Sequence, residues 1–348
     1  MSPTEQNALI LPVKQGNFVV STRPVPSPKV GEILIKVKAV SLNPIDSTIQ
    51  TVGYMVEKYP AVLGMDVAGE VASIGEGVES FSKGDRVFFQ TNPPIGPDYG
   101  GYQEYALAMV ETVAKIPEKF TYSQAATVPL TLTTAAVGLF ADAPSGAGLN
   151  PTWDPKVQYI GHSALVVGGS SSVGIFAIQL LKSLGFTHII AYASATHTEY
   201  LKSLGATTVI DRNKVPASDL TAAVAQICGQ VNIVYDAVFS SEGQAAGYEA
   251  LVDNGHLLSV RATPDAYVPK DVDDVRGRKV TTAYGSPHMP NNKVFGKILY
   301  KKLGGLLEKG TIVPLRIEEL PGGLESIVGG LDRLKAKSVS GKKLIVSL

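Results

Sequence analysis

The sequence predicts an α/β protein of two domains, one a doubly wound parallel sheet and the other rich in β-strands. Short β-like runs broken by Gly and Pro fill the chain up to about residue 128, and from Ser163 onward strands alternate with helices. Between Ala164 and Lys182 a buried strand, a glycine turn and a helix follow one another directly. Repeated βαβ units form parallel sheets, whereas many short strands with glycine-rich turns suit a barrel-like β domain.

The first part of the chain has period-two strands and then a helical stretch. The clearest strands are residues 32–40, 66–74 and 85–89. In the first of these, polar Lys36 and Lys38 alternate with apolar Ile35 and Val37, which predicts a half-buried strand. Over residues 123–140 the apolar side chains recur at helical spacing, which predicts a helix.

The second part alternates strands with helices. The predicted strands are 164–167, 188–193, 207–210, 232–238 and 256–260, and 279–284 is a further candidate that could pair across a two-fold axis or be covered. The predicted helices are one that ends at Leu184, then 196–204, 218–228 and 242–252. Gly185, Gly205 and Gly229 follow three of these helices, where glycine commonly ends a helix. Helices 293–309 and 323–335 and a strand 343–348 complete the chain, and composition leaves open which domain this tail joins.

Composition excludes several classes of function. The 348 residues suffice for two domains of roughly 150 residues each, and 31 basic residues balance 31 acidic ones. No global charge therefore attracts nucleic acid or an anionic membrane, so a small molecule, or a protein met through a local patch, is the expected partner. Cys228 is the single cysteine, which excludes internal disulfides and a cysteine-built zinc site. With no signal peptide and no apolar run of about 18 residues, we expect a soluble cytoplasmic protein.

The glycine turn predicts a dinucleotide site. Gly169 and Gly174 occupy the first and third glycine positions of a G-x-G-x-x-G run, whose other members are Ser170, Ser171, Ser172 and Val173. Ser171 stands where the second glycine would let the backbone approach a pyrophosphate, and a serine hydroxyl could instead donate to phosphate. The alternative is a Gly/Ser-rich turn that binds nothing, but the preceding strand, the following helix and the further βα units favour a dinucleotide.

The next strand end favours NADPH over NADH. An NAD-preferring site places Asp or Glu there, about 20 residues after the glycines, whereas residues 191–197 contain no carboxylate. Donors for a 2′-phosphate are available instead, namely Ser194, Thr196, His197, Tyr200 and Arg212. The alternative is that Ser194 and Thr196 only cap a helix and that Arg212 is a solvated charge.

These features resemble the medium-chain dehydrogenase/reductase superfamily. The β-rich start, the central dinucleotide fold and the ending 340–346 carry the resemblance, which covers nearly the whole chain. It implies a Rossmann domain over 129–283, inserted into a discontinuous, GroES-like catalytic domain of 1–128 plus 284–348, to which the tail returns. It also implies a nicotinamide in the cleft between the domains.

The resemblance also implies which residues line that cleft. In this sequence they are Pro44, Asp46, Thr134, Val238, Phe239, Val260, Arg261 and Ser340. Ordinary capping and turn formation is the alternative reading of these positions.

No metal is expected. Alcohol dehydrogenases of the superfamily bind zinc with a cysteine and with the histidine of a Gly-His-Glu motif, and the corresponding segments here are 41–46 and 64–70, with Met65 in place of the histidine. The five histidines show no paired metal-ligand spacing. Without a Lewis acid, reversible alcohol oxidation is disfavoured.

What remains is similar to zinc-independent quinone reductases and enoyl reductases. Adding hydride to the β-carbon of an enone or enoyl thioester and a proton to the α-carbon requires only hydrogen-bond donors and an acid. Mitochondrial-type enoyl reductases carry a tyrosine eleven residues after the asparagine of an Asn-Pro-Ser-Asp motif, and here Tyr54 follows Asn43 at that distance. Tyr54 is thus the candidate acid, unless it only packs a loop or a water molecule supplies the proton.

The serine-rich turn and the C-terminal segments look most like fungal trans-acting enoyl reductases, which serve polyketide synthases. We therefore expect an NADPH-dependent reductase of activated carbon–carbon double bonds, on a free or carrier-bound substrate, with a polyketide synthase as a possible partner. The alternatives are an NADPH:quinone reductase, a non-catalytic NADPH-binding module and a docking protein for a synthase. The sequence leaves the chain as a monomer or a homodimer.

Overall fold

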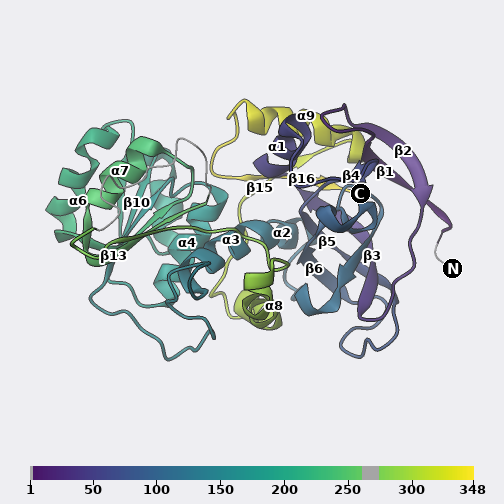
Figure 1. Cartoon of the computed structure of the whole chain (residues 1–348), viewed down its shortest axis with the longest axis horizontal. Helices are drawn as coiled ribbons and strands as arrows, with labels where there is room; N and C mark the ends of the chain where they lie inside the picture. Colours follow the sequence, from purple (N-terminus) through teal and green to yellow (C-terminus); the bar gives the residue numbers. More distant parts are fainter. Residues whose placement is uncertain (1–2, 261–273) are drawn as a thin grey trace. The chain divides into compact units, whose positions relative to one another are not determined.

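A computed structural model describes residues 3–260 and 274–348 of the chain (Figure 1). The fold divides into two compact units. The β-rich unit comprises Met1–Leu130, Leu299–Glu308 and Pro314–Leu348, and the sheet unit comprises Thr131–Ile298 and Lys309–Val313. Two helices, α3 (Pro129–Phe140) and α8 (Lys293–Glu308), contribute residues to both units.

The β-rich unit contains two sheets. A three-stranded sheet has the order β2-β1-β4, and a seven-stranded sheet has the order β15-β16-β3-β5-β6-β8, with β7 also paired to β3. The strands are β1 (Glu5–Leu11), β2 (Val19–Pro24), β3 (Glu32–Ser41), β4 (Ala61–Val62), β5 (Asp66–Ile74), β6 (Arg86–Gln90), β7 (Tyr105–Met109), β8 (Val113–Lys115), β15 (Ile317–Leu320) and β16 (Lys343–Ser347). The helices that lie wholly in this unit are α1 (Pro44–Val52), α2 (Tyr122–Ala126) and α9 (Ser326–Lys335).

Strand β3 alternates in exposure over residues 35–38, as predicted, but the rest of the strand is buried on both faces. Only Lys36 is exposed along it, and Leu34 packs with Tyr105 and Leu107 in a small core cluster. The strand is central, because β5, β7 and β16 all pair with it. The alternation with lysines therefore marks a short stretch of β3 that its neighbours leave accessible to solvent, and not a strand face that is solvated along its whole length.

The C-terminal tail joins the β-rich unit, as the resemblance implies. Strand β15 pairs in parallel with β16, and β16 pairs antiparallel with β3. Residues 284–298, which we assigned to the same domain from the sequence, cluster instead with the sheet unit. The reason is local packing: Gly285 lies against Thr134, and the Asn292 side-chain amide donates to the carbonyls of Tyr284 and Ser286 at 2.9 and 3.0 Å.

The sheet unit contains six parallel strands in the order β11-β10-β9-β12-β13-β14. The strands are β9 (Ser163–Val167), β10 (His188–Ala193), β11 (Thr208–Asp211), β12 (Val231–Asp236), β13 (Leu251–Ser259) and β14 (Lys279–Thr282). The helices between them are α4 (Ser172–Ser183), α5 (Thr198–Leu204), α6 (Leu220–Cys228) and α7 (Ser241–Glu249). Helix α4 packs on β9 and beside α5, whereas α7 packs on β12 and beside α6, which is the doubly wound arrangement.

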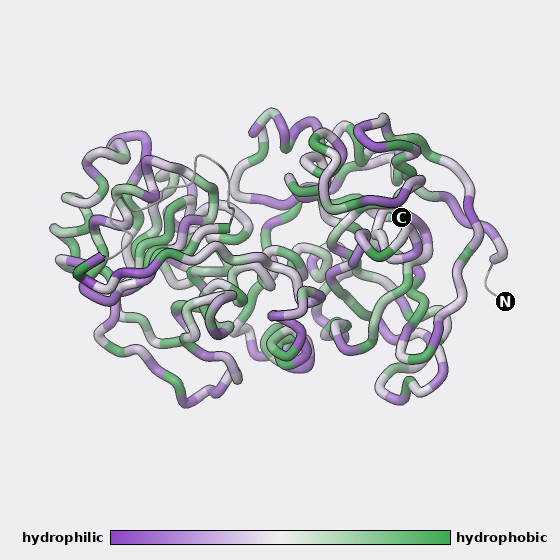
Figure 2. The backbone as a smooth tube through the Cα atoms, viewed as in Figure 1, coloured by the Kyte–Doolittle hydropathy of each residue, from purple (hydrophilic) through white to green (hydrophobic). Residues whose placement is uncertain are grey.

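Hydrophobic residues run along these parallel strands (Figure 2). One core cluster joins Leu165 and Val167 of β9 to Val224 of α6 and Tyr248 of α7, and all four are buried. Strands covered by helices on both faces are expected to be apolar throughout. None of the helices in the described parts of the chain is long and apolar enough to cross a membrane.

Candidate active site

The glycine turn lies at the carboxyl edge of the parallel sheet. Because all six strands run in one direction, the segments after β9, β10, β11, β12 and β13 meet at this edge. These are the segments that begin with Gly168, Ser194, Arg212, Ala237 and Val260. Ligands of doubly wound sheets bind at this edge, where the strand order reverses between neighbours such as β9 and β12.

The turn after β9 presents backbone donors. Gly168 adopts a positive φ of 74°, and its amide and that of Gly169 donate to the Tyr192 carbonyl at 3.0 and 3.2 Å. A side chain at Gly174 would lie 2.4 Å from the Gly168 carbonyl oxygen, so glycine is required there. The amides of Ser170, Ser172 and Val173 have no acceptor within the described residues. Together with the positive end of the twelve-residue α4, these three amides fit a phosphate group.

Ser171 is the N-cap of α4, which accounts for its departure from glycine. Its φ is −72°, and its hydroxyl oxygen accepts from the Gly174 amide at 3.1 Å. The hydroxyl also donates weakly to the Ala237 carbonyl at 3.4 Å. The hydroxyl is therefore engaged within the protein, and the backbone amides of the turn are the donors that remain available to a phosphate.

The turn after β10 gathers hydroxyl and amide groups. The hydroxyl oxygens of Ser194 and Thr196 lie 3.0 Å apart, and the Asn213 side-chain amide lies 3.5 Å from that of Ser194. The sequence interpretation missed a carboxylate here: Asp211, at the end of β11, accepts from the amides of Ala195 and Asn213 at 3.2 and 3.1 Å. The Asp211 carboxylate therefore links the turn after β10 to the turn after β11. It lies on the neighbouring strand β11, outside residues 191–197.

The other candidates for the 2′-phosphate lie around this turn. Arg212 is exposed and close enough to Tyr192 to oppose the rise that burial causes in the pKa of that phenol. His197 precedes α5, and Tyr200 lies within α5, both partly buried. The structure thus places all of these residues beyond the ends of β10 and β11.

A buried carboxylate that we did not predict shapes the turn after β12. Asp236 is fully buried and accepts from the amides of Val238, Phe239 and Ser240 at 3.2, 3.0 and 3.1 Å. The side-chain amide of Gln244 also donates to the Asp236 carboxylate, at 2.6 Å. Val238 is thereby left 49% exposed at the edge of the sheet. An aspartate that ends a buried strand, four residues before a serine N-cap, is the signal that could have revealed it.

Thr134 and Val260 also belong to the sheet unit. Thr134, on α3, is nearly buried, and its carbonyl accepts from the Tyr235 hydroxyl at 2.9 Å. Gly285 must lack a side chain, because a Cβ there would lie 1.9 Å from the Thr134 hydroxyl oxygen. The Val260 amide donates to the Asp236 carbonyl at 3.3 Å, which ties the ends of β12 and β13 together. Arg261 lies outside the described residues.

In the β-rich unit, Asp46 lies in a buried polar network rather than on a surface that contacts ligand. It is fully buried, and it accepts from the Asn43 amide at 3.1 Å, the Tyr102 hydroxyl at 2.9 Å and the Gly64 amide at 3.2 Å. Burial raises the pKa of Asp46 to about 7. Within this unit its contacts therefore support helix α1.

Asp66, the first residue of β5, is the second buried carboxylate of this network. It accepts from the Ser41 hydroxyl at 2.6 Å, the Asn43 side-chain amide at 2.8 Å and the Leu130 amide at 2.6 Å. The Lys343 ammonium lies 3.5 Å from the same carboxylate and donates to the Asn43 side-chain oxygen. Burial lowers the pKa of Lys343.

The remaining candidates of this unit lie around the network. Pro44 is the first residue of α1, where its missing amide hydrogen costs nothing. Tyr54 follows Gly53, which ends α1 with a φ of 71°, and the Tyr54 side chain is 40% exposed. Ser340 is exposed in the turn before β16.

The residues at the expected zinc positions do not fit zinc. Met65 is buried in the core, and both Ser41 and Asn43 are committed to Asp66 and its surroundings. Among the residues that the structure describes, no three His, Cys, Asp or Glu side chains are grouped so as to hold a metal ion. We therefore assign no chemical step to a metal.

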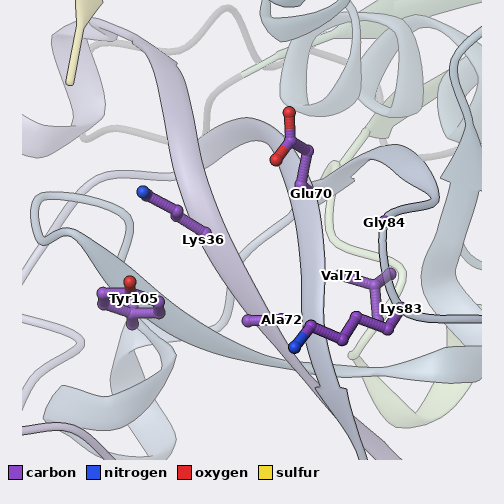
Figure 3. Close-up of a pocket in the computed structure, with 7 residues that line it drawn as sticks. All are labelled: Lys36, Glu70, Val71, Ala72, Lys83, Gly84 and Tyr105. Carbon is purple, nitrogen blue, oxygen red and sulfur yellow. The ribbon is translucent and has the colours of Figure 1, made fainter. Parts of the chain in front are cut away.

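A separate shallow pocket of about 210 Å³ lies on the β-rich unit (Figure 3). Its lining includes Lys36 of β3, Glu70 of β5 and Lys83 of the loop before β6. None of the predicted site residues lines it, and its charged side chains are exposed or half-buried. It is not part of the candidate site.

Comparison with known families and proteins gives a consistent result. Residues 29–118 match the alcohol dehydrogenase GroES-like domain, and residues 172–293 match the family described as zinc-binding dehydrogenase. The trans-enoyl reductase tndF of Aspergillus flavipes is 33% identical over 368 residues, covering 99% of both chains.

Solved structures share the fold over nearly the whole chain. An alcohol dehydrogenase superfamily protein from Novosphingobium aromaticivorans has a TM-score of 0.80 and 25% identity, covering 99% of each chain. The mycobacterial protein Rv1454c, solved in complex with NADPH, has a TM-score of 0.76 and 24% identity, covering 99% of this chain and 100% of its own.

Fold and sequence therefore agree on a GroES-like β domain combined with a Rossmann domain. The chain belongs to the medium-chain dehydrogenase/reductase superfamily, and it is an oxidoreductase with the fold of nicotinamide-dependent enzymes.

Proposed function

We propose that this protein is an NADPH-dependent, zinc-independent reductase of activated carbon–carbon double bonds in enoyl thioesters or enones. The observation that carries the proposal is the pairing of a phosphate-binding turn with metal positions that hold no metal ligands. The amides of Ser170, Ser172 and Val173 supply the first; at the second, residues 41–46 contain no cysteine and Met65 replaces the histidine. Relatives named trans-enoyl reductase support the same reaction class.

The cofactor preference rests on the turn after β10. When bound, NADPH supplies a hydride for the β-carbon of the acceptor. Ser194 and Thr196 offer hydroxyl donors to its 2′-phosphate, and the exposed Arg212 offers a cation nearby. His197 and Tyr200 are further candidates, while Thr134, Val238, Phe239, Val260, Arg261 and Ser340 are proposed for the nicotinamide half.

The preference for NADPH has a direct test. Arg212→Ala should lower kcat/KM for NADPH by roughly tenfold or more and leave that for NADH nearly unchanged, because a charge-assisted hydrogen bond to phosphate contributes about 1.5–3 kcal/mol. Lys214→Ala, two residues on, is the matched control. Equal losses of kcat/KM with NADPH and NADH would show that Arg212 does not bind the 2′-phosphate.

Tyr54 is our candidate for the proton donor. Its side chain is 40% exposed, directly after a glycine that ends α1. A phenol is neutral at pH 7, so it can protonate the α-carbon after hydride has reached the β-carbon. The hydride and the proton together saturate the double bond, and no metal takes part.

The substrate is proposed to be carried by a partner protein. Relatives bear the name trans-enoyl reductase, and the resemblance to fungal enzymes of that kind implies a polyketide synthase as the partner. The partly buried Cys228 thiol suits a reducing compartment, and we propose a cytoplasmic location.

The test follows NADPH absorbance with enoyl thioesters, enones and quinones. Wild-type protein should turn over enoyl thioesters or enones, and Tyr54→Phe should lower kcat by roughly 100-fold. Tyr59→Phe is the matched control, because the Tyr59 hydroxyl lies in the same loop and donates to the Val56 carbonyl at 3.3 Å. Reduction of quinones alone would favour an NADPH:quinone reductase, and binding without turnover would favour a non-catalytic module. An unchanged rate in Tyr54→Phe would remove Tyr54 as the acid.

A further inference from the structure

One buried network joins three segments that carry candidate site residues. Asn43 and Asp46 begin α1, which leads to Tyr54, and Lys343 begins β16 three residues after Ser340. Asp66 links both to the Leu130 amide at the start of α3. The side chains of Asp46, Asp66 and Lys343 are each at most 4% exposed. The network thus lies at the first residues of α1, α3 and β16, which carry or adjoin the residues of the proposed site.

The network contains one cation and two carboxylates. Lys343 lies 3.5 Å from the Asp66 carboxylate, which also accepts from Ser41, Asn43 and Leu130. The hydrogen-bond partners of Asp46 are all neutral, namely the Asn43 and Gly64 amides and the Tyr102 hydroxyl. An uncompensated charge at a buried site is strongly destabilising. One proton on Asp46 makes the network neutral, whereas the Tyr102 hydroxyl donates to the Asp46 carboxylate at 2.9 Å and so favours its ionised form.

Protonation of Asp46 affects the base of α1. The Asn43 amide donates to the Asp46 carboxylate and the Asp46 amide donates to the Asn43 carbonyl, both at 3.1 Å, and these bonds hold the first turn of this helix. Once the proton is lost, Asp46 repels Asp66 and shares the single ammonium of Lys343. If the first turn of α1 opened, water would enter and reduce this repulsion, and the Gly53–Tyr54 turn lies at the other end of the same nine-residue helix.

We propose that Asp46 is a positioning residue that holds α1, and through it Tyr54, in place while it carries a proton. This inference rests on the proposed function, in which Tyr54 is the proton donor. The charged and titratable groups that face Asp46 are Asp66 on β5, Lys343 on β16 and Tyr102 in the loop before β7. Their balance makes enzyme activity fall as pH rises through the neutral range.

The experiment compares pH profiles of kcat between pH 6 and pH 9. Wild-type activity should fall by about tenfold per pH unit on the alkaline side, as expected for loss of one proton. Asp46→Asn, which is isosteric and does not titrate, should remove this limb. Tyr102→Phe should move it to higher pH, because the Tyr102 hydroxyl lowers the pKa of Asp46. Asp85→Asn, whose carboxylate pairs with Lys115 elsewhere in the unit, is the control and should keep the wild-type limb.

A second measurement separates this inference from the proposed function. Hydrogen exchange of the α1 amides, corrected for intrinsic rates, should accelerate with pH in the wild type and in Asp85→Asn, but not in Asp46→Asn. This result would support positioning by Asp46 even if no enoyl substrate were reduced, which would refute the proposed function alone. A limb that persists in Asp46→Asn, or exchange that does not depend on pH in the wild type, would overturn the inference. If Asp46→Asn does not fold, the inference is tested by Tyr102→Phe, in which the alkaline limb of the kcat profile should move to higher pH.

Discussion

Two carboxylates, the buried Asp236 and the half-buried Asp211, organise the backbone of turns in this protein. Asp236 binds three consecutive amides after β12, and Asp211 binds the amides of Ala195 and Asn213. Each therefore fixes the path of a turn at the edge where the candidate residues lie. Removing the Asp236 carboxylate would leave the partly buried amides of Val238, Phe239 and Ser240 without acceptors, which costs about 1–3 kcal/mol per group.

His256 should make stability fall in mild acid. Burial lowers its pKa to about 4, and its ring nitrogen lies 2.9 Å from the Thr281 hydroxyl across the β13–β14 pair. Between pH 4 and 6.5 the unfolded chain therefore binds the proton that the folded chain excludes, so stability declines as pH falls through this window. At pH 5 the loss is on the order of 1–2 kcal/mol.

The measurement is urea unfolding of wild type and His256→Gln at pH 7.5 and pH 5.0. The variant does not titrate, so its stability relative to wild type should improve at the lower pH. Thr281→Val removes the hydroxyl but keeps the imidazole, and it should show the acid loss. A constant difference between wild type and His256→Gln at both pH values would contradict the assignment.

Site residues that lie next to one another in the sequence could be predicted from it. The glycine turn and its serine are contiguous, so pattern alone located them. The Asp46–Asp66–Lys343 network was not predictable, since Lys343 is 300 positions from Asn43 and only the pairing of β16 with β3 brings them together. For the same reason, Asp46 was assigned to cofactor contact although its side chain is buried.

The start of α4 allows capping and phosphate binding to be separated. Asp is as good an N-cap as Ser, so Ser171→Asp should change the free energy of unfolding by less than about 0.5 kcal/mol. The added charge would lie beside the free amides of Ser172 and Val173 and repel a pyrophosphate. NADPH affinity should fall roughly tenfold or more.

Thr121→Asp is the matched control for this substitution. Thr121 caps α2 by accepting from the Gln124 amide at 3.1 Å, and it lies in the β-rich unit. NADPH binding, measured by fluorescence titration, should be unaffected in this variant. If Ser171→Asp bound NADPH as tightly as wild type, the turn after β9 would not be the phosphate site.

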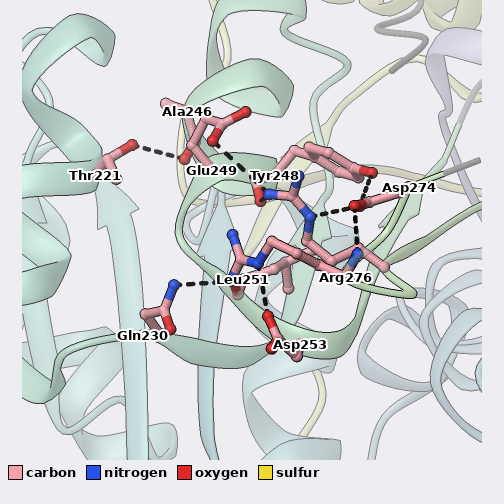
Figure 4. A network of polar contacts seen from close by, with 10 residues as sticks. Thr221, Gln230, Ala246, Tyr248, Glu249, Leu251, Asp253, Asp274 and Arg276 are labelled. Atoms are coloured by element: carbon pink, nitrogen blue, oxygen red, sulfur yellow. Dashed lines mark hydrogen bonds and ion pairs between the residues drawn. The ribbon is translucent and has the colours of Figure 1, made fainter. Parts of the chain in front are cut away.

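A network of polar contacts holds the segment that precedes β14 (Figure 4). Arg278 pairs with Asp274 at 2.6 Å, lies 4.1 Å above the Tyr248 ring and donates to the Tyr248 carbonyl at 3.1 Å. Its side chain is only 10% exposed. Arg278→Met should therefore destabilise the protein by roughly 2 kcal/mol, because it leaves these partners unsatisfied.

The neighbouring Arg276 gives the comparison for that prediction. Arg276 pairs with Asp253 at 2.6 Å, but the Asp253 side chain is 71% exposed. Exposed pairs contribute little, so Arg276→Met should cost less than about 1 kcal/mol. Urea unfolding measures the loss in free energy of unfolding for each variant, which should be larger for Arg278→Met. Equal losses would show that burial does not distinguish the two arginines.

Element boundaries deviate from prediction where tertiary contacts or proline intervene. The predicted helix 123–140 is two helices, α2 and α3, because Pro129 lacks an amide hydrogen and begins a new helix. Strand β13 begins at Leu251, five residues before its predicted start, although Asp253 and Asn254 resemble a turn. Its register against β12 shifts between Val231 and Ile233, an irregularity that pattern does not reveal.

At the scale of the whole molecule, periodicity was sufficient to predict the fold class. Every predicted strand between 164 and 260 is present in the parallel sheet. The family resemblance was needed to place Pro314–Leu348 in the β-rich unit, but it placed residues 284–298 there as well, and these cluster with the sheet unit. Packing of Gly285 on Thr134 decides their place.

The proposed independence from zinc is testable on the intact protein. The buried Met65 stands where the superfamily's zinc enzymes have histidine, and the described residues contain no group of metal-ligating side chains. Dialysis against 1,10-phenanthroline should therefore leave both the NADPH-dependent rate and Tm unchanged. NADPH at 100 times its Kd should raise stability by about 2.7 kcal/mol, before and after this treatment. Loss of the rate on chelation, with recovery on added zinc, would refute a metal-free mechanism, whereas an unchanged rate leaves the proton and hydride steps to the protein's own donors and its cofactor.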